Sequence, residues 1–350
     1  MRILLLHPPE RHPSGGHVYN RNLLRAARRQ SFPLEAQTMS LGRRDAPALA
    51  PDTIVLWDSL LLESLARRPL AAKGATHGLL VHYLPFRDPG LGTTARLLRK
   101  ARFDRAVARV RFLVATGREV AGFLRRRYPS RQVALCEPGI DPLFLSARRM
   151  AARKQDDRVH LVTVAPLIPA KGHEDLISAL QSLEDFPWVW HWVGSPDVAP
   201  RHAARLRARI RELGWEERIV CHGTLATPAL ARLLARMDVF VSASRFESYG
   251  MALAEAAAIG LPAVTTAVGE ACRIVRPGET GWLVAPGDTT GLWEALRTTI
   301  EDPALRDRFR ARLLEESPRS WQETLADLRR GLAGFFRGSP APVDRRRARA

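Results

Sequence analysis

The stretch Ser244–Thr266, SRFESYGMALAEAAAIGLPAVTT, places two carboxylates on either side of a predicted helix start. It connects the apolar run MDVFVSA to the apolar run PAVTT, and both runs have the composition of buried strands. The Ala-rich segment between them is predicted to be a helix that starts at Gly250 and is ended by Gly260. Glu247 therefore follows the first strand directly, and Glu255 lies about one and a half turns inside the helix.

The same alternation of short apolar runs and amphipathic stretches extends along the whole chain. The predicted strands are RILLL, DTIVLW, GLLVHY, FLVAT and QVALC in the first half, and VHLVTVA, WVWHWVG, RIVCHG, MDVFVSA, PAVTT and GWLV in the second. Helical segments such as HEDLISALQSL and RLRARIREL lie between them. This order predicts an α/β fold with parallel sheets, helices on both faces, and ligands at the carboxyl ends of the strands.

The pattern restarts near residue 158, after the polar segment SARRMAARKQDDR. A chain of 350 residues is long for one core, so we expect two Rossmann-like doubly wound domains that face each other across a cleft. The expected divisions are an N-terminal domain at 1–155, a C-terminal domain at 156–318, a helix at 319–336 and a basic tail at 337–350. The composition of the tail predicts disorder.

Composition argues against several classes of protein. The three cysteines, Cys136, Cys221 and Cys272, lack paired spacing, which argues against a disulfide framework and against a cysteine metal site. The longest apolar runs are far shorter than the roughly 18–20 residues of a membrane span. The first apolar run, RILLL, is also too short for the core of a signal peptide. We therefore expect a cytoplasmic protein.

The net charge of +18 is unevenly distributed. Residues 1–157 contain 28 Lys and Arg against 13 Asp and Glu, whereas residues 158–350 contain 26 against 23. A one-sided basic surface indicates an anionic partner, such as membrane lipid, a phosphorylated substrate or nucleic acid. Solvated helix faces in an Arg-rich protein are the simpler alternative. No aromatic-basic RNA signature or zinc finger accompanies the charge, so we do not expect nucleic-acid binding.

One basic segment, ARLLRKARFDRAVARVR, has the pattern of a helix that lies on an anionic membrane. It could instead bind a polyanionic acceptor. The cations that we expect to face the membrane surface are Arg96, Arg99, Lys100, Arg102, Arg105 and Arg109. On this interpretation the protein is peripheral on the inner face of the membrane.

The start of the Ala-rich helix is suited to bind an anion. The amides of Gly250, Met251 and Ala252 have no partner within the helix and form the positive end of its dipole. Carboxylates suit vicinal diols because they accept two charge-assisted hydrogen bonds. A diphosphate at the helix start, with sugar hydroxyls near Glu247 and ribose hydroxyls near Glu255, fits this spacing. An exposed loop acid and a solvated helix acid are the simpler interpretation of two isolated glutamates.

The stretch ESYGMALAE resembles the E-x7-E motif of retaining GT-B glycosyltransferases. The resemblance continues through MDVFVSASRFESYG before the motif and GLPAVTTAVGEACRIVRPGETGWLVAPGD after it. VTVAPLIPAKGHEDLISAL resembles the opening of the family's second domain, and SWQETLADL its final crossing helix. HPSGGHVYNRNLL resembles the family's first glycine-rich loop, and LLVHYLP a strand that ends in a functional histidine. Together the segments are most similar to glycosyltransferase family 4.

This resemblance implies a GT-B fold whose first domain binds an acceptor and whose second binds a nucleotide sugar. It implies retention of the anomeric configuration without metal or cofactor, and no Asp-x-Asp metal motif is present. The catalytic residues that it implies are His82, Lys171 and Glu247. The donor-binding residues that it implies are Gly15, Gly16, Lys171, Gly194, Gly223, Glu247, Gly250, Met251, Ala252 and Glu255.

Several of these positions have simpler interpretations. A Lys before Gly, as at Lys171, is usually a surface cation at a helix entry. A glycine pair such as Gly15 and Gly16 mostly marks a turn. A single histidine on a strand, such as His82, is more often a packed side chain than a catalytic one.

Three positions depart from the family pattern. Pro166 stands where the family usually carries Arg, and Ala165 replaces the usual Gly before it. The missing charge-assisted hydrogen bond is worth about 1.5–3 kcal/mol, so we expect weaker donor binding or slower catalysis unless another cation compensates. Arg273 stands where relatives often have an acid, and it is a candidate for that compensation.

The resulting expectation is transfer of a hexosyl unit from a nucleotide diphosphate sugar to a polysaccharide, a lipid-linked molecule or another cell-envelope acceptor. Two alternatives remain open. A non-catalytic GT-B protein would bind a glycan or a nucleotide sugar without turnover. Another GT-B enzyme, such as a sugar-nucleotide epimerase or a phosphorylase, would use the same fold for different chemistry.

Overall fold

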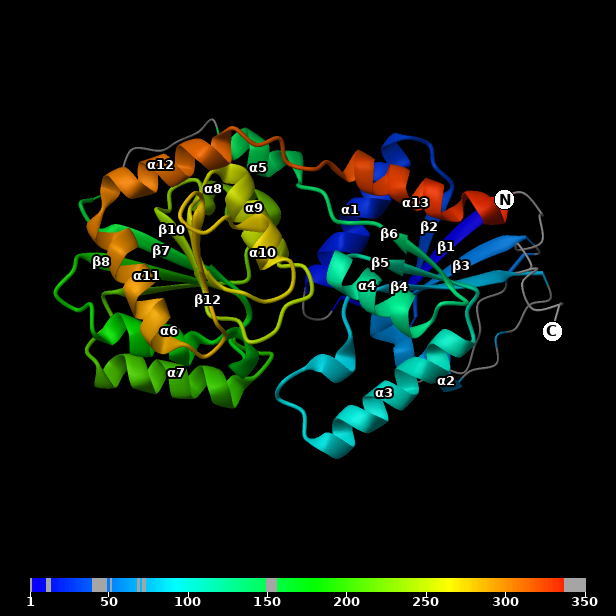
Figure 1. Ribbon diagram of the computed structural model, residues 1–350, viewed down its shortest axis with the longest axis horizontal. Helices are drawn as coiled ribbons and strands as arrows, with labels where there is room; N and C mark the ends of the chain where they lie inside the picture. Colours follow the sequence, from blue (N-terminus) through cyan, green and yellow to red (C-terminus); the bar gives the residue numbers. More distant parts are fainter. Residues whose placement is uncertain are drawn as a thin grey trace, which may run out of the picture.

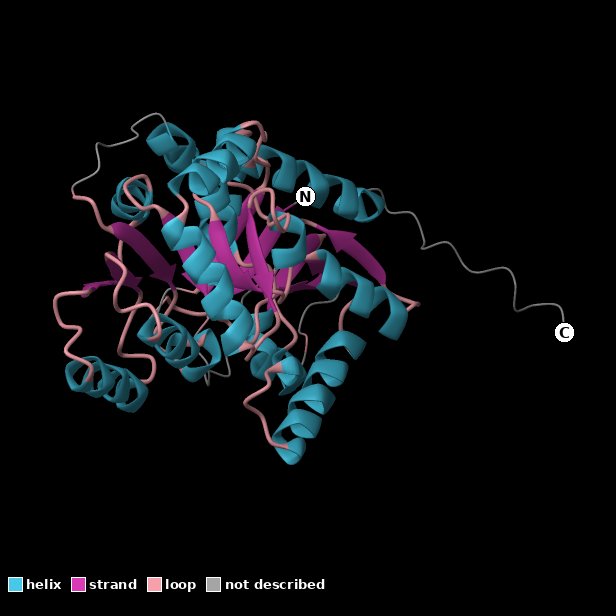
Figure 2. Cartoon of the chain, turned by 60° about the vertical axis from the view of Figure 1, so that its left-hand side comes forward, coloured by secondary structure: helices cyan, strands magenta, loops and turns pink. Residues whose placement is uncertain are grey.

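The computed structural model describes residues 2–10, 14–39, 49–50, 52–67, 70, 74–148 and 156–336. The described chain forms two α/β units that lie side by side, each with one parallel sheet between layers of helices (Figures 1 and 2). This confirms the predicted fold class. The predicted tail at 337–350 lies outside the described residues.

The first sheet has six parallel strands in the order β2-β1-β3-β4-β5-β6. Its strands are β1 (Arg2–His7), β2 (Leu34–Thr38), β3 (Thr53–Asp58), β4 (Thr76–Val81), β5 (Phe112–Ala115) and β6 (Gln132–Leu135). The helices of this half are α1 (Gly15–Arg29), α2 (Leu62–Arg67), α3 (Thr93–Ala108), α4 (Arg118–Arg127) and α5 (Pro142–Ala147), with short 3-10 turns η1 (Ser59–Leu61) and η2 (Pro85–Arg87).

The second sheet also has six parallel strands, in the order β12-β11-β10-β7-β8-β9. Its strands are β7 (Val159–Val164), β8 (Trp188–Val193), β9 (Ile219–Gly223), β10 (Val239–Ser242), β11 (Ala263–Thr266) and β12 (Gly281–Val284). The helices that follow are α6 (His173–Gln181), α7 (Pro200–Glu212), α8 (Thr227–Leu234), α9 (Met251–Ile259), α10 (Ala271–Ile274), α11 (Thr289–Glu301), α12 (Pro303–Leu314) and α13 (Trp321–Phe336), with a 3-10 turn η4 (Pro169–Lys171).

Every strand predicted from the sequence is present, but β2 was not predicted. Its sequence, LEAQT, contains only two apolar residues, and all of its residues except Leu34 are exposed. β2 lies at the edge of the sheet, where one side has no neighbouring strand. Polar residues are tolerated at such an edge, so periodicity does not reveal the strand.

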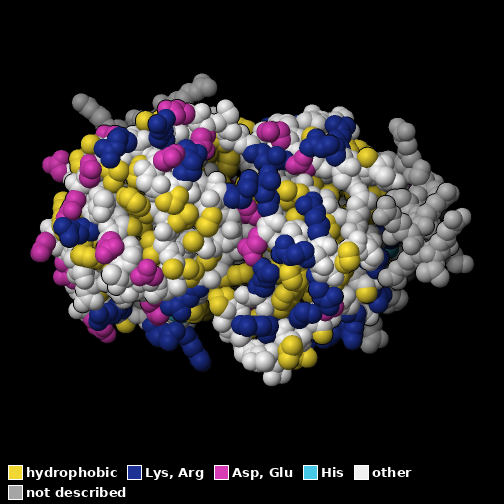
Figure 3. All heavy atoms as spheres, viewed as in Figure 1, with side chains coloured by type: hydrophobic (Ala, Val, Ile, Leu, Met, Phe, Trp, Pro, Cys, Tyr) yellow, Lys and Arg dark blue, Asp and Glu magenta, His cyan; other side chains and the backbone are white. Residues whose placement is uncertain are grey.

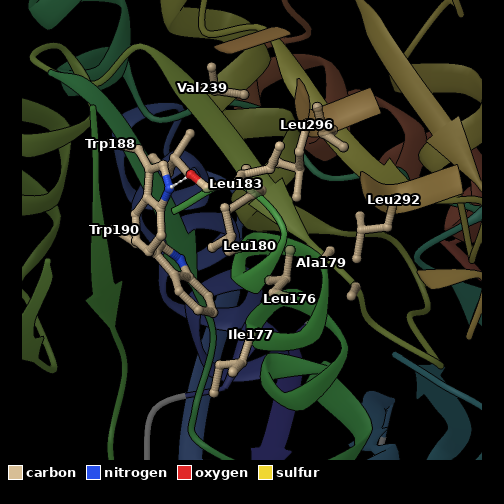
Figure 4. Close-up of a cluster of buried hydrophobic side chains, with 14 of the residues drawn as sticks. Leu176, Ile177, Ala179, Leu180, Leu183, Trp188, Trp190, Val239, Leu292 and Leu296 are labelled. Carbon is tan, nitrogen blue, oxygen red and sulfur yellow. Dashed lines mark hydrogen bonds between the residues drawn. The ribbon is translucent and has the colours of Figure 1, made fainter. Parts of the chain in front are cut away.

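Strand β8 shows how the core of the second sheet forms. Its sequence, WVWHWV, alternates so that Trp188, Trp190 and Trp192 share one face of the sheet. These rings join the cluster around Leu176 and Leu180 of α6, and the indole of Trp188 donates a hydrogen bond to the carbonyl of Leu183 (Figure 4). The cluster fixes α6, and therefore the loop before it, against the sheet.

Two helices join the halves. α13 begins after the second sheet and returns to pack on α1 and β6 of the first (Figure 1), with Leu325 and Leu328 fully buried. α5 packs on α8 and α9 of the second half, and Phe144 is buried in that core. The predicted boundary at 155/156 therefore assigns α5 to the first domain although α5 packs with the second. The residues at 149–155 lie outside the described part of the chain.

Candidate active site between the two sheets

A cavity of about 590 Å3 lies between the two halves and is lined by loops that follow their strands. The first half contributes loops after β1, β3, β4, β5 and β6, and the second contributes loops after β7, β8, β9, β10 and β11. Nearly all the predicted site residues line it. They are Gly15, Gly16, His82, Lys171, Gly194, Glu247, Gly250, Met251, Ala252 and Glu255.

Lys171 and Glu247 meet in this cleft. The Lys171 ammonium donates a hydrogen bond to Glu247 Oε1, which also accepts one from the Ser244 hydroxyl at 3.2 Å. The side chains of Lys171 and Glu247 are only 17% and 28% exposed. Lys171 is therefore not a free surface cation, and Glu247 is not an exposed loop acid. The pair places one cation and one carboxylate within reach of the same ligand.

Gly172 explains how Lys171 reaches this position. Its φ of +66° lies in the left-handed region, and a Cβ there would be 2.0 Å from the carbonyl oxygen of Ala243. Only glycine therefore allows the loop after β7 to lie directly against the end of β10. Because β7 and β10 are neighbours in the sheet, this contact brings Lys171 beside the loop that carries Glu247.

The helix start predicted at Gly250 is present at the cleft. Gly250 has a φ of +88° and no side chain caps the first turn of α9, so the amides of Met251 and Ala252 remain available to a ligand. Gly260 ends the helix with a φ of +89°, as predicted. The helix dipole and the Lys171 ammonium together favour an anion in the cleft.

Glu255 is buried rather than solvated. It is only 8% exposed, and this burial raises the pKa of its carboxyl to about 8; the nearby charge of Asp141 adds to the rise, whereas Arg21 opposes it. The carboxyl therefore carries a proton at neutral pH. A protonated carboxyl both donates and accepts hydrogen bonds, which suits contact with a hydroxyl pair.

On the opposite wall, His82 lies against Asp58. His82 Nε2 is 3.3 Å from Asp58 Oδ2, and the same oxygen accepts a hydrogen bond from Asn20 at 2.5 Å. Burial alone would raise the pKa of Asp58, but His82 and the hydrogen bonds from Leu60 and Asn20 outweigh it and lower that pKa. The ionised Asp58 thus fixes the orientation of the His82 ring.

Gly16 is also explained by His82. A Cβ at Gly16 would be 3.0 Å from the imidazole of His82, so a larger residue would push the ring away from its place. Tyr19 packs edge-on against the same ring, with centroids 5.2 Å apart. The glycine pair after β1 is therefore part of the cleft wall and begins α1, rather than forming an isolated turn.

Two predicted positions, Gly223 and Arg273, do not line the cleft. Gly194 lines the cleft, but Gly223 does not; its carbonyl accepts a hydrogen bond from the Gly194 amide at 2.8 Å, and the next residues, Thr224 and Leu225, line the cleft instead. Pro166 lies in the wall where the family's Arg would be. Arg273 does not line the cavity and lies 3.5 Å from Glu270, so it does not replace that cation.

Sequence reasoning missed three polar residues. Asp58 and Asn20 orient His82, and the buried carboxylate of Glu270 accepts a hydrogen bond from the Glu119 amide, at 2.9 Å, in the first turn of α4. Glu270 thereby links the second half to a helix of the first. Asp58 could have been found, because it ends the strand TIVLWD at the same edge as the other site residues; Asn20 and Glu270 left no such signal.

Comparison with known families supports the sequence resemblance. Residues 147–313 match the family described as "Glycosyl transferases group 1". A D-inositol 3-phosphate glycosyltransferase of Nocardioides sp. is 32% identical over 218 residues, which cover 56% of this chain and 47% of that protein. A glycogen synthase of Mycobacterium tuberculosis is 36% identical over 126 residues, covering 35% of this chain and 30% of that protein. The chain spans about half the length of the inositol phosphate relatives that it matches.

Solved structures agree on the fold over nearly the whole chain. Sucrose-phosphate synthase from Thermosynechococcus elongatus has a TM-score of 0.76 at 19% identity, covering 97% of this chain and all (100%) of that one. Anabaena HepE in complex with UDP-glucose has a TM-score of 0.71 at 18% identity, covering 95% and 100%. The predicted resemblance to GT-B glycosyltransferases and the GT-B fold are confirmed.

Proposed function

We propose that this protein is a retaining, metal-independent glycosyltransferase of the family 4 type. It transfers a hexosyl unit from a nucleotide diphosphate sugar to a polysaccharide, a lipid-linked molecule or another cell-envelope acceptor. The observation that carries the proposal is the meeting of Lys171 and Glu247 beside the start of α9. The complexes of HepE with UDP and with UDP-glucose support a nucleotide sugar as the ligand.

In this proposal the diphosphate binds between the Lys171 ammonium and the amides at the start of α9. Negative charge develops on the diphosphate as the glycosidic bond breaks, and these positive groups stabilise it. The Glu247 carboxylate binds hydroxyls of the transferred sugar through charge-assisted hydrogen bonds. Glu255, which carries a proton, binds hydroxyls of the ribose both as donor and as acceptor. His82, held by Asp58, contacts the sugar from the other wall. The catalytic effect comes from positioning and electrostatics, and no side chain becomes covalently attached.

Two measurements test the proposal. A thermal-shift series with UDP, GDP and ADP should show stabilisation by at least one nucleotide, since a ligand that binds only the folded state raises its stability. Release of that nucleotide from its sugar conjugate, in the presence of glycan or lipid-linked acceptors, then measures turnover. The proposal fails if no nucleotide stabilises the protein.

A non-catalytic nucleotide-sugar-binding protein is the second candidate, and Pro166 favours it. The cleft wall lacks the guanidinium that the family uses at this position, and Arg273 does not supply one. Such a protein would bind a nucleotide sugar without releasing nucleotide over hours, whether or not an acceptor is present. Slow release that depends on Lys171 would instead identify an enzyme.

We further propose that α3 attaches the protein to the inner face of the membrane. Figure 1 shows this helix along the lower edge of the N-terminal half, and Lys and Arg side chains are dense over this half in Figure 3. Leu97 and Leu98 are 62% and 55% exposed between its cations. Acids partly balance these cations, since Arg102 pairs with Glu63 and Lys100 with Asp104. No helix among the described residues could cross a bilayer.

Flotation with vesicles that contain phosphatidylglycerol tests this attachment. We expect binding that weakens as salt is added, because salt screens the attraction between the cations and the lipid. Replacing Leu97 and Leu98 by Ser should reduce binding, whereas Leu314→Ser, at a leucine that is 41% exposed on the other half, should not. Binding that survives the α3 changes would place the membrane contact elsewhere.

A further inference from the structure

The buried carboxylate of Glu270 joins the two halves directly, without passing through α5 or α13. Glu270 follows β11 of the second half, and its side chain is only 4% exposed. Its Oε1 accepts a hydrogen bond from the Glu119 amide, at 2.9 Å, in the first turn of α4 of the first half. Figure 1 shows α10, which begins just after Glu270, and α4 on facing sides of the junction between the halves. A carboxylate is rarely buried this completely unless it is paired.

Helix α4 lacks a cap of its own. Its N-cap residue is Gly117, which has no side chain to accept hydrogen bonds from the free amides of the first turn. The Glu270 carboxylate supplies that acceptor from the other half, and its negative charge faces the positive end of the helix dipole. Its second oxygen, Oε2, lies 3.5 Å from Nε of Arg273. Separation of the halves would therefore leave the start of α4 uncapped.

The contact depends on a close approach at Gly117. A Cβ atom at this position would lie 3.1 Å from Glu270 Oε1 and 3.4 Å from the carbonyl oxygen of Ser248. The first distance is shorter than an ordinary van der Waals contact, so a side chain here would push the two halves apart. Gly117 thus lets the start of α4 contact the loops after β10 and β11 at the same time.

The same contact lies between the two walls of the cleft. In the second half, a Cβ atom at Gly269 would lie 2.9 Å from the carbonyl oxygen of Glu247, so the loop that carries Glu270 packs directly against the backbone of Glu247. In the first half, the hydroxyl of Thr116, the residue before the N-cap of α4, lies 3.5 Å from the carbonyl oxygen of His82. A short series of contacts through Glu270 therefore connects the wall that carries Glu247 to the wall that carries His82.

We propose that Glu270 is a positioning residue, which holds the His82 wall at the distance from Glu247 that a nucleotide sugar requires. The proposal rests on the proposed transfer reaction. Free nucleotide contacts the second half alone, so its binding does not need the halves to be held together. A nucleotide sugar contacts both walls, so its apparent affinity falls with the fraction of molecules in which the walls are correctly placed. Once bound, the sugar itself bridges the walls, and kcat changes little.

Glu270→Ala removes the contact, and initial rates measure the result. We expect KM for the nucleotide sugar to rise about fivefold or more, because a carboxylate at a partly buried helix start shifts a two-state equilibrium by about that factor. We expect an unchanged kcat and an unchanged affinity for free nucleotide in titration calorimetry. Glu270→Gln keeps an acceptor oxygen without the charge, so the rise in KM should be smaller.

Glu301→Ala is the matched control, because Glu301 is an exposed acid of α11 in the same half and pairs only with Arg297 of its own helix within the described chain. We expect its KM to equal that of the wild-type protein. An unchanged KM in Glu270→Ala overturns the proposal. A parallel loss of kcat and of nucleotide affinity in Glu270→Ala also overturns it, because that result shows a role in the local fold of the loop rather than in the placement of the walls.

A variant of the opposite half tests the same contact without altering Glu270. Gly117→Val adds a side chain that points toward the Glu270 carboxylate, and the extended backbone at this position, with φ of −149° and ψ of 156°, is compatible with valine. We expect the same rise in KM at an unchanged kcat. If Gly117→Val leaves KM unchanged, the close approach of the halves is not required and the proposal fails.

Small-angle X-ray scattering of the ligand-free protein tests the contact independently of turnover. We expect a larger radius of gyration for Glu270→Ala and Gly117→Val than for the wild-type protein and Glu301→Ala, because the halves are held together for less of the time. Equal radii in all four proteins overturn the proposal. If the radii differ as expected but none of the proteins turns over a donor, the contact through Glu270 is supported and the transferase proposal fails.

Discussion

The two walls of the cleft use polar side chains in different ways. On the C-terminal wall, Lys171 and Glu247 are partly exposed and a ligand can contact them directly. On the N-terminal wall, Asp58, Asn20 and His82 are all less than 7% exposed and mainly contact one another. The first wall is suited to stabilise charge on a ligand, and the second to hold one ring in a fixed orientation. Substitutions on the first wall should therefore have larger effects on catalysis.

The largest effect is expected from Lys171→Ala and Glu247→Ala. Each removes a group that contacts the donor, and loss of one such electrostatic contact lowers turnover by roughly 100- to 1000-fold; we expect each variant to reach at least the upper figure. Initial rates of nucleotide release measure this. Arg245→Ala is the control, because its guanidinium pairs with Asp175 away from the cleft lining. Near-wild-type turnover in either variant would refute the assigned roles.

Glu255→Gln should stabilise the ligand-free protein at neutral and higher pH. The raised pKa, about 8, means that Glu255 binds a proton more tightly in the folded state than in the unfolded state, so the carboxyl destabilises the fold above the unfolded pKa. The penalty is absent below about pH 4, grows as the pH rises, and levels off above about pH 8. We expect a gain of about 4 kcal/mol in the free energy of unfolding at pH 8, because each unit of the rise in pKa from 4.5 to about 8 is worth roughly 1.4 kcal/mol.

Urea unfolding of both proteins at pH 4 and pH 8 measures this difference. The two should be similar at pH 4 and diverge at pH 8. A constant difference across this range would show that the change acts through packing rather than through the proton.

Asp58→Asn tests the N-terminal wall. The change keeps the shape of the side chain but removes the charge that holds His82, and loss of such an orienting partner costs roughly 10- to 100-fold in activity. We expect kcat to fall by this amount while the affinity for the free nucleotide, measured by titration calorimetry, stays the same. A loss of nucleotide affinity instead of turnover would mean that the two walls do not have separate roles.

The smallest effect is expected from Pro166→Arg, which adds a cation to the C-terminal wall. One additional charge-assisted hydrogen bond to the diphosphate should raise kcat/KM about tenfold. A matched Pro166→Gln variant controls for loss of the proline ring. A gain in both variants would indicate relief of backbone restraint rather than added charge.

The sequence predicted the C-terminal wall better than the N-terminal one. The strands and the helix stop at Gly260 leave patterns that are local in the chain, and Glu247 and Glu255 lie within one such stretch. Lys171 and His82 were assigned to the site by the family resemblance. Asn20 was missed because its role depends on a contact with Asp58, 38 residues away in the chain. Asp58 ends a predicted strand and could have been found. Gly223 was predicted to line the cleft, but the next residue, Thr224, lines it instead. The hydrogen bond from the Gly194 amide to the Gly223 carbonyl joins backbone atoms, so the residue types do not reveal it.

The sequence by itself determined the two parallel sheets, because short apolar runs that alternate with amphipathic helices are buried as strands of a sheet covered by those helices. The sequence also located the loops that follow the strands, where the site residues lie. Only the tertiary structure decided which loops meet. Lys171 reaches Glu247 because β7 and β10 are adjacent, and Asp58 reaches His82 because β3 and β4 are adjacent. The burial that keeps a proton on Glu255 likewise comes from its neighbours in space. Pairing and desolvation depend on distances between atoms that are far apart in the chain, and residue order does not specify these distances.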